Sequence, residues 1–153
     1  MTQSKKLIVI TGPTASGKTN CAIELANHFN TEIISFDSRQ FYKEMNIGTA
    51  KPTVKELSKA KHHFIGHLSI HDEYNAGIFG AEAEVLTEKL FQQHDTLIAV
   101  GGSGLFMRAW LDGLDEFPKV EEDVRNSLNN IFEEKGIASL QNLLREKDPE
   151  YFK

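Results

Sequence analysis

Apolar positions change their period several times along the first hundred residues, which predicts alternating strands and helices. The continuous apolar run "KLIVIT" (6–11) is typical of a strand buried on both faces of a parallel sheet. "EIISF" (32–36) predicts a second strand, which ends at Asp37. Between them lies a predicted helix with one apolar face, made of Ala22, Leu25, Ala26 and Phe29. Strand, glycine-containing loop and helix thus follow one another as in a βαβ unit.

The middle of the chain continues this alternation after a long irregular stretch. Residues 39–71 predict mostly loop, with a short helix at "TVKELSKAK" that begins at Thr53, after Pro52. "TLIAV" (96–100) predicts a third buried strand, followed by "GGSG" and a helix at "LFMRAWLDG". A longer amphipathic helix precedes that strand, with Phe79, Ala83, Leu86 and Leu90 on its core face. The pattern favours a parallel α/β sheet flanked by helices.

The pattern becomes purely helical after Pro118. Gly136 separates two predicted helices, and their apolar positions are Val124, Leu128 and Ile131 in the first and Ile137, Leu140, Leu143 and Leu144 in the second. Two helices with no further strand predict the beginning of an α-helical subdomain. We therefore predict an α/β core domain at 1–117 and the start of a helical domain at 118–153.

Composition limits the function classes. The chain has 153 residues, which suffice for a buried core, and a net charge of -5, which gives no general electrostatic surface for nucleic acid. RNA binding would need a local patch. The single cysteine, Cys21, allows no internal disulfide, and the first residues do not resemble a secretory signal. The apolar runs are too short to cross a bilayer. We expect a soluble, cytoplasmic protein without membrane contact.

The loop after the first predicted strand has the spacing of a phosphate-binding loop. Gly12, Gly17, Lys18 and Thr19 fit G-x-x-x-x-G-K-[ST] without a gap, between a predicted strand and a predicted helix. The glycines let backbone N–H groups turn toward an anion, Lys18 neutralises phosphate oxygens, and the Thr19 hydroxyl can ligate Mg²⁺. A glycine-rich turn that merely connects strand to helix is the simpler alternative.

A nucleotide hydrolase would also need an acidic residue at the end of another apolar strand. "TLIAV" does not provide one, because it runs into Gly101 and Gly102. Asp37, at the end of "EIISF", is the remaining candidate. From the residues alone, Asp37 is either a metal-binding acid or a base.

Three motifs in order resemble the tRNA dimethylallyltransferases, also called tRNA isopentenyltransferases. They are "GPTASGKT", "FDSRQFYKEMNIGTAKP" and "VGGSGLFMRA", and "HHFIGHLSIHDEYNAGIF" resembles the family's segment between the last two. The resemblance covers nearly the whole chain. It implies a P-loop NTPase-like parallel sheet flanked by helices, with the start of an α-helical insertion subdomain. It also implies that the loop holds the diphosphate of dimethylallyl diphosphate rather than ATP.

The resemblance implies an alkyl transfer from dimethylallyl diphosphate to N6 of the adenosine next to the anticodon of a tRNA, with Mg²⁺ as cofactor and Thr19 as its ligand. Asp37 is the expected base, and Ser103 is expected to join it in catalysis. The diphosphate is expected on Gly12, Pro13, Thr14, Ala15, Ser16, Gly17, Lys18 and Thr19. The tRNA contacts are expected at Asp37, Ser38, Arg39, Gln40, Ser103 and Arg125.

The sequence departs from the family pattern in three places. The usual Asp-Ser-Met-Gln has Arg39 at its third position, and the usual Gly-Gly-Thr-Gly-Leu-Tyr has Ser103 and Phe106. Ser103 keeps a hydroxyl, whereas Phe106 loses one. The chain also has about half the usual family length, so we interpret it as an N-terminal fragment that binds diphosphate but is inactive in transfer by itself.

Other functions compete with prenyl transfer. A small-molecule or nucleotide kinase would use the same loop for ATP, but it should have clustered arginines around the transferred phosphoryl group. A non-catalytic RNA-binding module should have a basic surface. His63, His67 and His71 recur every four residues, yet Gly66 and the mixed pattern argue against a helix that would gather them around a metal. We expect a monomer.

Overall fold

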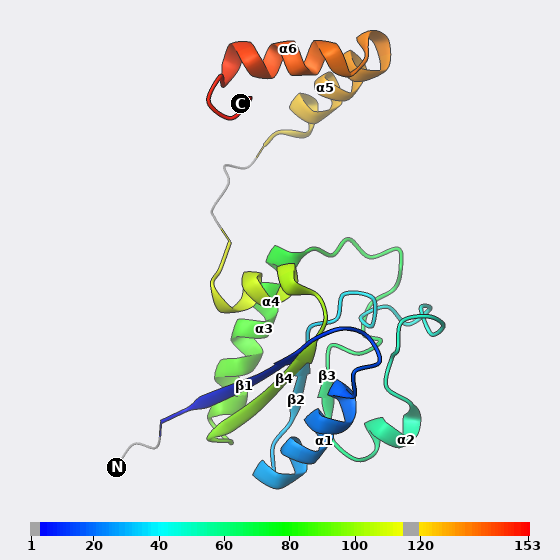
Figure 1. The fold of residues 1–153 in the computed structure, drawn as a ribbon, viewed down its shortest axis with the longest axis vertical. Coiled ribbons are helices and arrows are strands. Elements are labelled where there is room, and N and C mark those ends of the chain that lie inside the picture. Colours follow the sequence, from blue (N-terminus) through cyan, green and yellow to red (C-terminus); the bar gives the residue numbers. More distant parts are fainter. Residues whose placement is uncertain (1–3, 115–119) are drawn as a thin grey trace. The chain divides into compact units, whose positions relative to one another are not determined.

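The computed structural model describes residues 4–114 and 120–153. The chain forms two compact units, Met1–Leu114 and Asp115–Lys153. The first unit contains the sheet and the second contains two helices, which Figure 1 shows in orange and red. The predicted domain boundary between residues 117 and 118 lies outside the described residues.

The first unit is built on a parallel sheet, as the sequence predicts. The order of its four strands is β1-β4-β2-β3. Their bounds are β1 Lys6–Thr11, β2 Ile33–Ser35, β3 His62–His63 and β4 Thr96–Gly101. β1 pairs with β4 from Lys6 opposite Thr96 to Thr11 opposite Gly101. Because all strands run in one direction, the loops that follow β1, β2 and β4 meet at one edge of the sheet.

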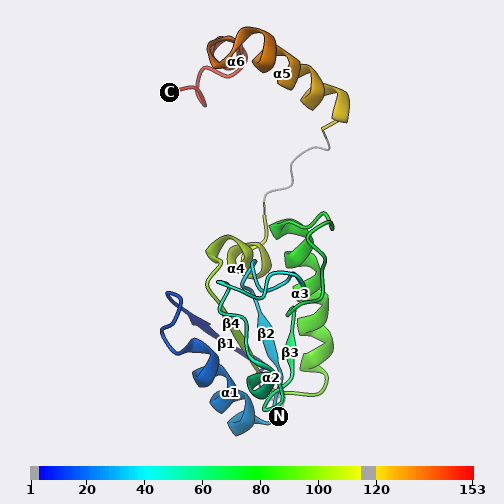
Figure 2. The same cartoon turned by 90° about the vertical axis from the view of Figure 1, so that its right-hand side faces the viewer.

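Helices cover both faces of this sheet (Figure 2). α1 (Lys18–Phe29) lies on one face, and α3 (Ala76–Phe91) and α4 (Gly104–Leu111) lie on the other. Successive residues of a strand point to opposite faces. The α1 face accordingly buries Ala22, Ile23, Ala26, Ile33, Ile98 and Val100. The other face buries Ile34, Leu97, Ala99, Phe79, Ala83 and Trp110.

β1 is less buried than its apolar run predicts. Lys6 and Thr11 are exposed and the four residues between them are half-buried. Leu7 and Val9 pack against the core on one face, and Ile8 and Ile10 pack against the core on the other, so both faces are covered but only in part. The reason is position, because β1 lies at the edge of the described sheet and pairs there with β4 alone. In α1, Ile23 is buried instead of the predicted Phe29, which is 41% exposed.

The segment between β2 and α3 contains less helix and more strand than predicted. α2 spans only Val54–Leu57. It begins after Thr53, as predicted, because the Thr53 hydroxyl accepts a hydrogen bond from the Glu56 N–H and the Glu56 carboxylate accepts one from the Thr53 N–H. The two-residue strand β3 was not predicted, because so short a strand has no recognisable period.

The second unit contains the two predicted helices. α5 spans Glu122–Lys135 and α6 spans Ile137–Lys147. Gly136 separates them with φ 73°, a conformation that glycine adopts readily. Neither helix has a fully buried residue. The apolar stripes of α5 and α6 therefore remain largely open within this unit.

Candidate active site

The loop between β1 and α1 has the backbone of an anion cradle. Gly12 has φ 153° and Gly17 has φ 86°, conformations that favour glycine. Ala15, with φ 64°, adopts a similar conformation despite its side chain, which marks a strained position. α1 begins at Lys18 and has no acidic residue in its first turn. The partial positive charge of the helix N-terminus is therefore directed at the loop without local competition.

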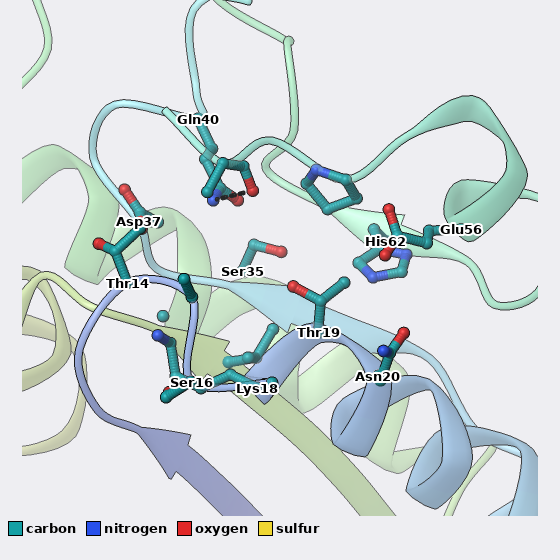
Figure 3. A pocket seen from close by; sticks show the side chains of 16 residues that line it. Thr14, Ser16, Lys18, Thr19, Asn20, Ser35, Asp37, Gln40, Glu56 and His62 are labelled. Atoms are coloured by element: carbon teal, nitrogen blue, oxygen red, sulfur yellow. Dashed lines mark hydrogen bonds between the residues drawn. The ribbon is translucent and has the colours of Figure 1, made fainter. Parts of the chain in front are cut away.

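This loop forms one wall of a cavity of about 270 Å³. Residues 14–20 line it from the loop and the start of α1. The facing wall includes Ser35 at the end of β2, Asp37 and Gln40 after it, and Glu56 and His62 further along the chain. Figure 3 shows Thr14, Ser16, Lys18 and Thr19 on one side of this space and Asp37, Ser35 and His62 on the other. Phosphate-binding groups and a carboxylate therefore share one cavity.

The Lys18 ammonium is held by its own loop. Lys18 Nζ donates a hydrogen bond of 2.5 Å to the carbonyl oxygen of Pro13. A lysine is a flexible point charge whose ammonium can turn to a phosphate oxygen. The loop thus keeps the Lys18 ammonium beside the cavity before an anion binds.

Asp37 is positioned by the end of β2 and by Gly101. A Cβ at Gly101 would lie 2.7 Å from the carbonyl carbon of Phe36, so only glycine allows β4 to approach the chain just before Asp37 this closely. Asp37 Oδ1 accepts a hydrogen bond from the Arg39 N–H at 3.3 Å. The Asp37 carbonyl accepts one from the Gln40 N–H at 2.9 Å, which closes a turn. These contacts therefore fix the backbone that carries the half-buried carboxylate of Asp37.

Ser103 lies against that turn rather than in the cavity wall. Its Oγ accepts a hydrogen bond from the Ser38 N–H at 2.9 Å and donates one to Ser38 Oγ at 3.0 Å. Among the described residues, Ser38, Arg39 and Ser103 are not part of the cavity lining. The structure brings Ser103 to the residue next to Asp37, so its direct contact is with the turn that carries the carboxylate.

Gln40 has a structural contact that the sequence did not indicate. Its side chain is buried, and Nε2 donates hydrogen bonds of 3.1 Å to the carbonyl oxygens of Thr49 and Ala50. These bonds tie the segment after Asp37 to the wall formed by Ala50 and Pro52. The predicted contact of Gln40 with a base stays a prediction, with Oε1 as the atom left for it.

The two arginines assigned to tRNA are both exposed. Arg39 lies at the turn after Asp37, and Arg125 lies on α5 of the second unit. Their contacts with tRNA stay predictions. Phe106, where the family pattern has tyrosine, packs into the core with ring centroids 5.4 Å from Phe41 and 5.6 Å from Phe79.

The histidines have separate environments. His63 Nε2 lies 2.5 Å from Glu32 Oε2, on the outer strand β3. His67 packs edge-on against Phe41, Phe64 and Tyr74, with both ring nitrogens buried and without a hydrogen-bond partner among the described residues. Burial lowers the pKa of His67 below its usual value. We therefore expect His67 to be neutral at neutral pH, packed among these aromatic rings.

Ser35 and His62 are cavity residues that were not predicted. Ser35 Oγ and His62 Nε2 are buried and have no hydrogen-bond partner within residues 4–114 and 120–153. The polar Ser35 inside the apolar run "EIISF" was the signal available for one of them. His62 gave no such signal, because its place in the cavity depends on the pairing of β3 with β2.

The donor set fits a hard cation that keeps most of its water. The Thr19 hydroxyl and the orphaned Ser35 hydroxyl line the cavity. In the part of the chain that the structure describes, no three His, Cys, Asp or Glu side chains form a metal-binding group. Mg²⁺ is commonly held by one or two protein groups together with substrate phosphates and waters. The residues present suit that arrangement.

Comparisons with known proteins agree with this geometry. The family model described as IPP transferase matches residues 40–153. A tRNA dimethylallyltransferase of Christiangramia forsetii is 53% identical over 150 residues, which are 98% of this chain and 50% of that protein. The chain spans about half the length of the curated relatives it matches.

Solved structures lead to the same family. The full-length tRNA isopentenylpyrophosphate transferase of Bacillus halodurans is 33% identical with a TM-score of 0.70, over 97% of this chain and 50% of that one. A eukaryotic dimethylallyltransferase acting on tRNA is 29% identical with a TM-score of 0.80, over 97% and 37% of the two chains. No helix among the described residues is both long and apolar enough to span a membrane. With a family model covering most of its length, the chain belongs to the IPP transferase family.

Proposed function

We propose that the protein containing this chain transfers a dimethylallyl group from dimethylallyl diphosphate to N6 of the adenosine 3′ of the anticodon in tRNA. Diphosphate is the second product. The observation that carries this proposal is the cavity that Asp37 shares with residues 14–20 of the phosphate-binding loop. The names of the relatives support the same reaction.

Asp37 acts as the base in this proposal. The N6 lone pair forms a bond to C1 of the dimethylallyl group, the bond from C1 to the diphosphate oxygen breaks, and its electron pair leaves with the diphosphate. The carboxylate of Asp37 takes the proton from N6. An exocyclic aromatic amine is a weak nucleophile, so proton removal by a positioned carboxylate accelerates this step. The turn bonded to Ser103 fixes the direction of that carboxylate.

The loop stabilises the leaving diphosphate. The backbone N–H groups of residues 14–19 and the N-terminus of α1 surround the anion, and Lys18 Nζ moves from the Pro13 carbonyl to its oxygens. Mg²⁺, held through Thr19, neutralises charge on the diphosphate when it is bound. The groups that stabilise the leaving anion are thus in place before the reaction begins.

The tRNA is the partner in this proposal. Exposed Arg39 can stack on a base or pair with a phosphate, and Arg125 supplies a second contact from α5. Base contacts of Ser38 and Gln40 belong to the same proposal. We propose that the protein acts on tRNA in the cytoplasm, as a monomer.

A kinase is the alternative that the relatives' names argue against, since those names describe prenyl transfer to tRNA. The deciding experiment supplies the full-length protein with tRNA and either labelled dimethylallyl diphosphate or γ-labelled ATP. The proposal expects label from the prenyl donor in the tRNA and none from ATP. Transfer of the ATP γ-phosphoryl group to a small acceptor, with no prenyl transfer, would support the kinase instead.

A further inference from the structure

Two buried polar atoms on the cavity wall have no partner among the described residues. Ser35 is only 1% exposed, and its Oγ has no hydrogen bond within that part of the chain. His62 Nε2 is buried in the same way. A buried polar group without a hydrogen-bond partner destabilises the fold. Both residues line the cavity, so a ligand that enters it is the available partner.

The strand register explains why these two side chains work together. β2 and β3 are parallel, and Ile33 is paired with His62. Ile33 and Ser35 are two residues apart on β2, so Ser35 lies on the same sheet face as His62. Ile33 packs against α1 on that face. Ser35 and His62 therefore face the side where α1 begins with Lys18 and Thr19.

The hydrogen bonds of His62 determine what its free nitrogen can do. His62 Nδ1 lies 2.9 Å from the Ala60 carbonyl oxygen, and a carbonyl can only accept, so Nδ1 carries the hydrogen. Burial lowers the pKa of His62, although a hydrogen bond to Ala60 and the charge of Glu56 oppose this. In the neutral ring Nε2 is an acceptor. A ligand that bonds His62 Nε2 must therefore donate a hydrogen bond.

We infer that Ser35 and His62 accept hydrogen bonds from water molecules of a magnesium–diphosphate ligand and so form an outer-sphere metal site beside Thr19. This inference rests on the proposed function, because the diphosphate in the loop brings the cation. Mg²⁺ loses its waters reluctantly, and those waters are strong donors. The cavity offers acceptors for them without a cluster of carboxylates, in keeping with the donor set of the described residues.

The test measures inorganic diphosphate binding by calorimetry, with and without Mg²⁺. The variants are Ser35→Ala, which removes the orphaned hydroxyl, and His62→Phe, which keeps an aromatic ring without nitrogens. His63→Phe is the matched control, because His63 is the neighbouring residue of β3 and pairs with Glu32. We expect each cavity variant to reduce the gain in affinity that Mg²⁺ provides by roughly tenfold. Binding without Mg²⁺, and the control, should be unchanged.

Two results overturn the inference alone. A full Mg²⁺-dependent gain in both cavity variants would show that neither atom contacts the hydrated cation. An equal loss with and without Mg²⁺ would show direct contact with the diphosphate instead. If the unaltered chain binds no diphosphate in either condition, the proposed function fails and this inference fails with it. Circular dichroism and thermal unfolding confirm that each variant is folded before its binding is compared.

Discussion

The hydroxyl of Ser103 bonds Ser38 twice, accepting from its backbone N–H at 2.9 Å and donating to its Oγ at 3.0 Å. These bonds join the loop after β4 to the residue that follows Asp37. Because Ser103 does not line the cavity, we expect it to affect the chemistry only through the position of Asp37.

Ser103→Ala should therefore slow prenyl transfer by the full-length protein by about tenfold, the worth of one or two hydrogen bonds of ordinary strength. Diphosphate affinity should stay the same. Ser103→Thr keeps the hydroxyl and should restore the rate. Single-turnover kinetics and diphosphate titrations measure both quantities. A rate unchanged by the alanine substitution would remove Ser103 from this role.

Lys18→Ala should abolish protection of the fold by diphosphate. At a hundredfold excess over Kd, a ligand that binds only the native state adds about 2.7 kcal/mol, which raises Tm by roughly 5–10 °C for a chain of this size. Differential scanning fluorimetry with dimethylallyl diphosphate, diphosphate and ATP measures the shift. Protection by ATP, with none by either diphosphate, would contradict the assignment of the loop.

His67→Phe should stabilise the chain and reduce its sensitivity to mild acid. The substitution removes two buried nitrogens that lack partners among the described residues, so we expect a gain of about 1 kcal/mol at pH 7. Burial lowers the folded-state pKa of His67, with Glu82 opposing and Lys43 assisting that shift. The unfolded state therefore binds more protons below about pH 6.5, and stability is lost as the pH falls through this range.

The His67→Phe variant should lose less stability than the unaltered chain between pH 7 and pH 5. The stability that the variant still loses in this range is due to His62, whose pKa is also lowered by burial. The carboxylate of Glu32 acts in another range. Burial would raise its pKa, but hydrogen bonds from His63 and Lys61 outweigh this and lower it, so its contribution is lost only below about pH 4.5. Urea unfolding at several pH values separates the two ranges. An unchanged pH dependence would show that His67 is not the group responsible.

Gly101→Ala should destabilise the fold by about 1–3 kcal/mol, because its Cβ would press against the Phe36 backbone. Gly104→Ala is the matched control, since a Cβ there meets nothing within 4 Å and the residue begins α4. Alanine favours a helix over glycine, so the control should be neutral or slightly stabilising. Equal stability of the two variants in thermal unfolding would show that the close approach is not needed.

Local patterns predicted most of the architecture. The apolar run at Thr96–Gly101, the phosphate-loop spacing and the capping residue Thr53 each depend on near neighbours in sequence, and the strand and the cap were confirmed. The degree of burial of β1 depends on which strands lie beside it, which the run of apolar residues does not contain. For the same reason, the sequence pattern did not predict the exposure of Phe29.

Long-range pairing determined the rest of the candidate site. Asp37 was found from the end of an apolar strand, but the contact of Ser103 with Ser38 joins residues 65 positions apart. The cavity position of His62 follows from its pairing with Ile33. The amide of Gln40 holds Thr49 and Ala50, a contact for which a polar loop sequence gives no signal.

Asp37→Asn in the full-length protein provides the most direct measurement of the central claim. The amide keeps the shape and can still hydrogen-bond to N6, but it cannot take a proton at neutral pH. Mass spectrometry of the adenosine beside the anticodon, after reaction with dimethylallyl diphosphate and Mg²⁺, follows the rate of transfer. The account predicts a fall of roughly a hundredfold or more with diphosphate affinity nearly unchanged. A normal transfer rate, or a loss confined to Mg²⁺-dependent diphosphate binding, would contradict it.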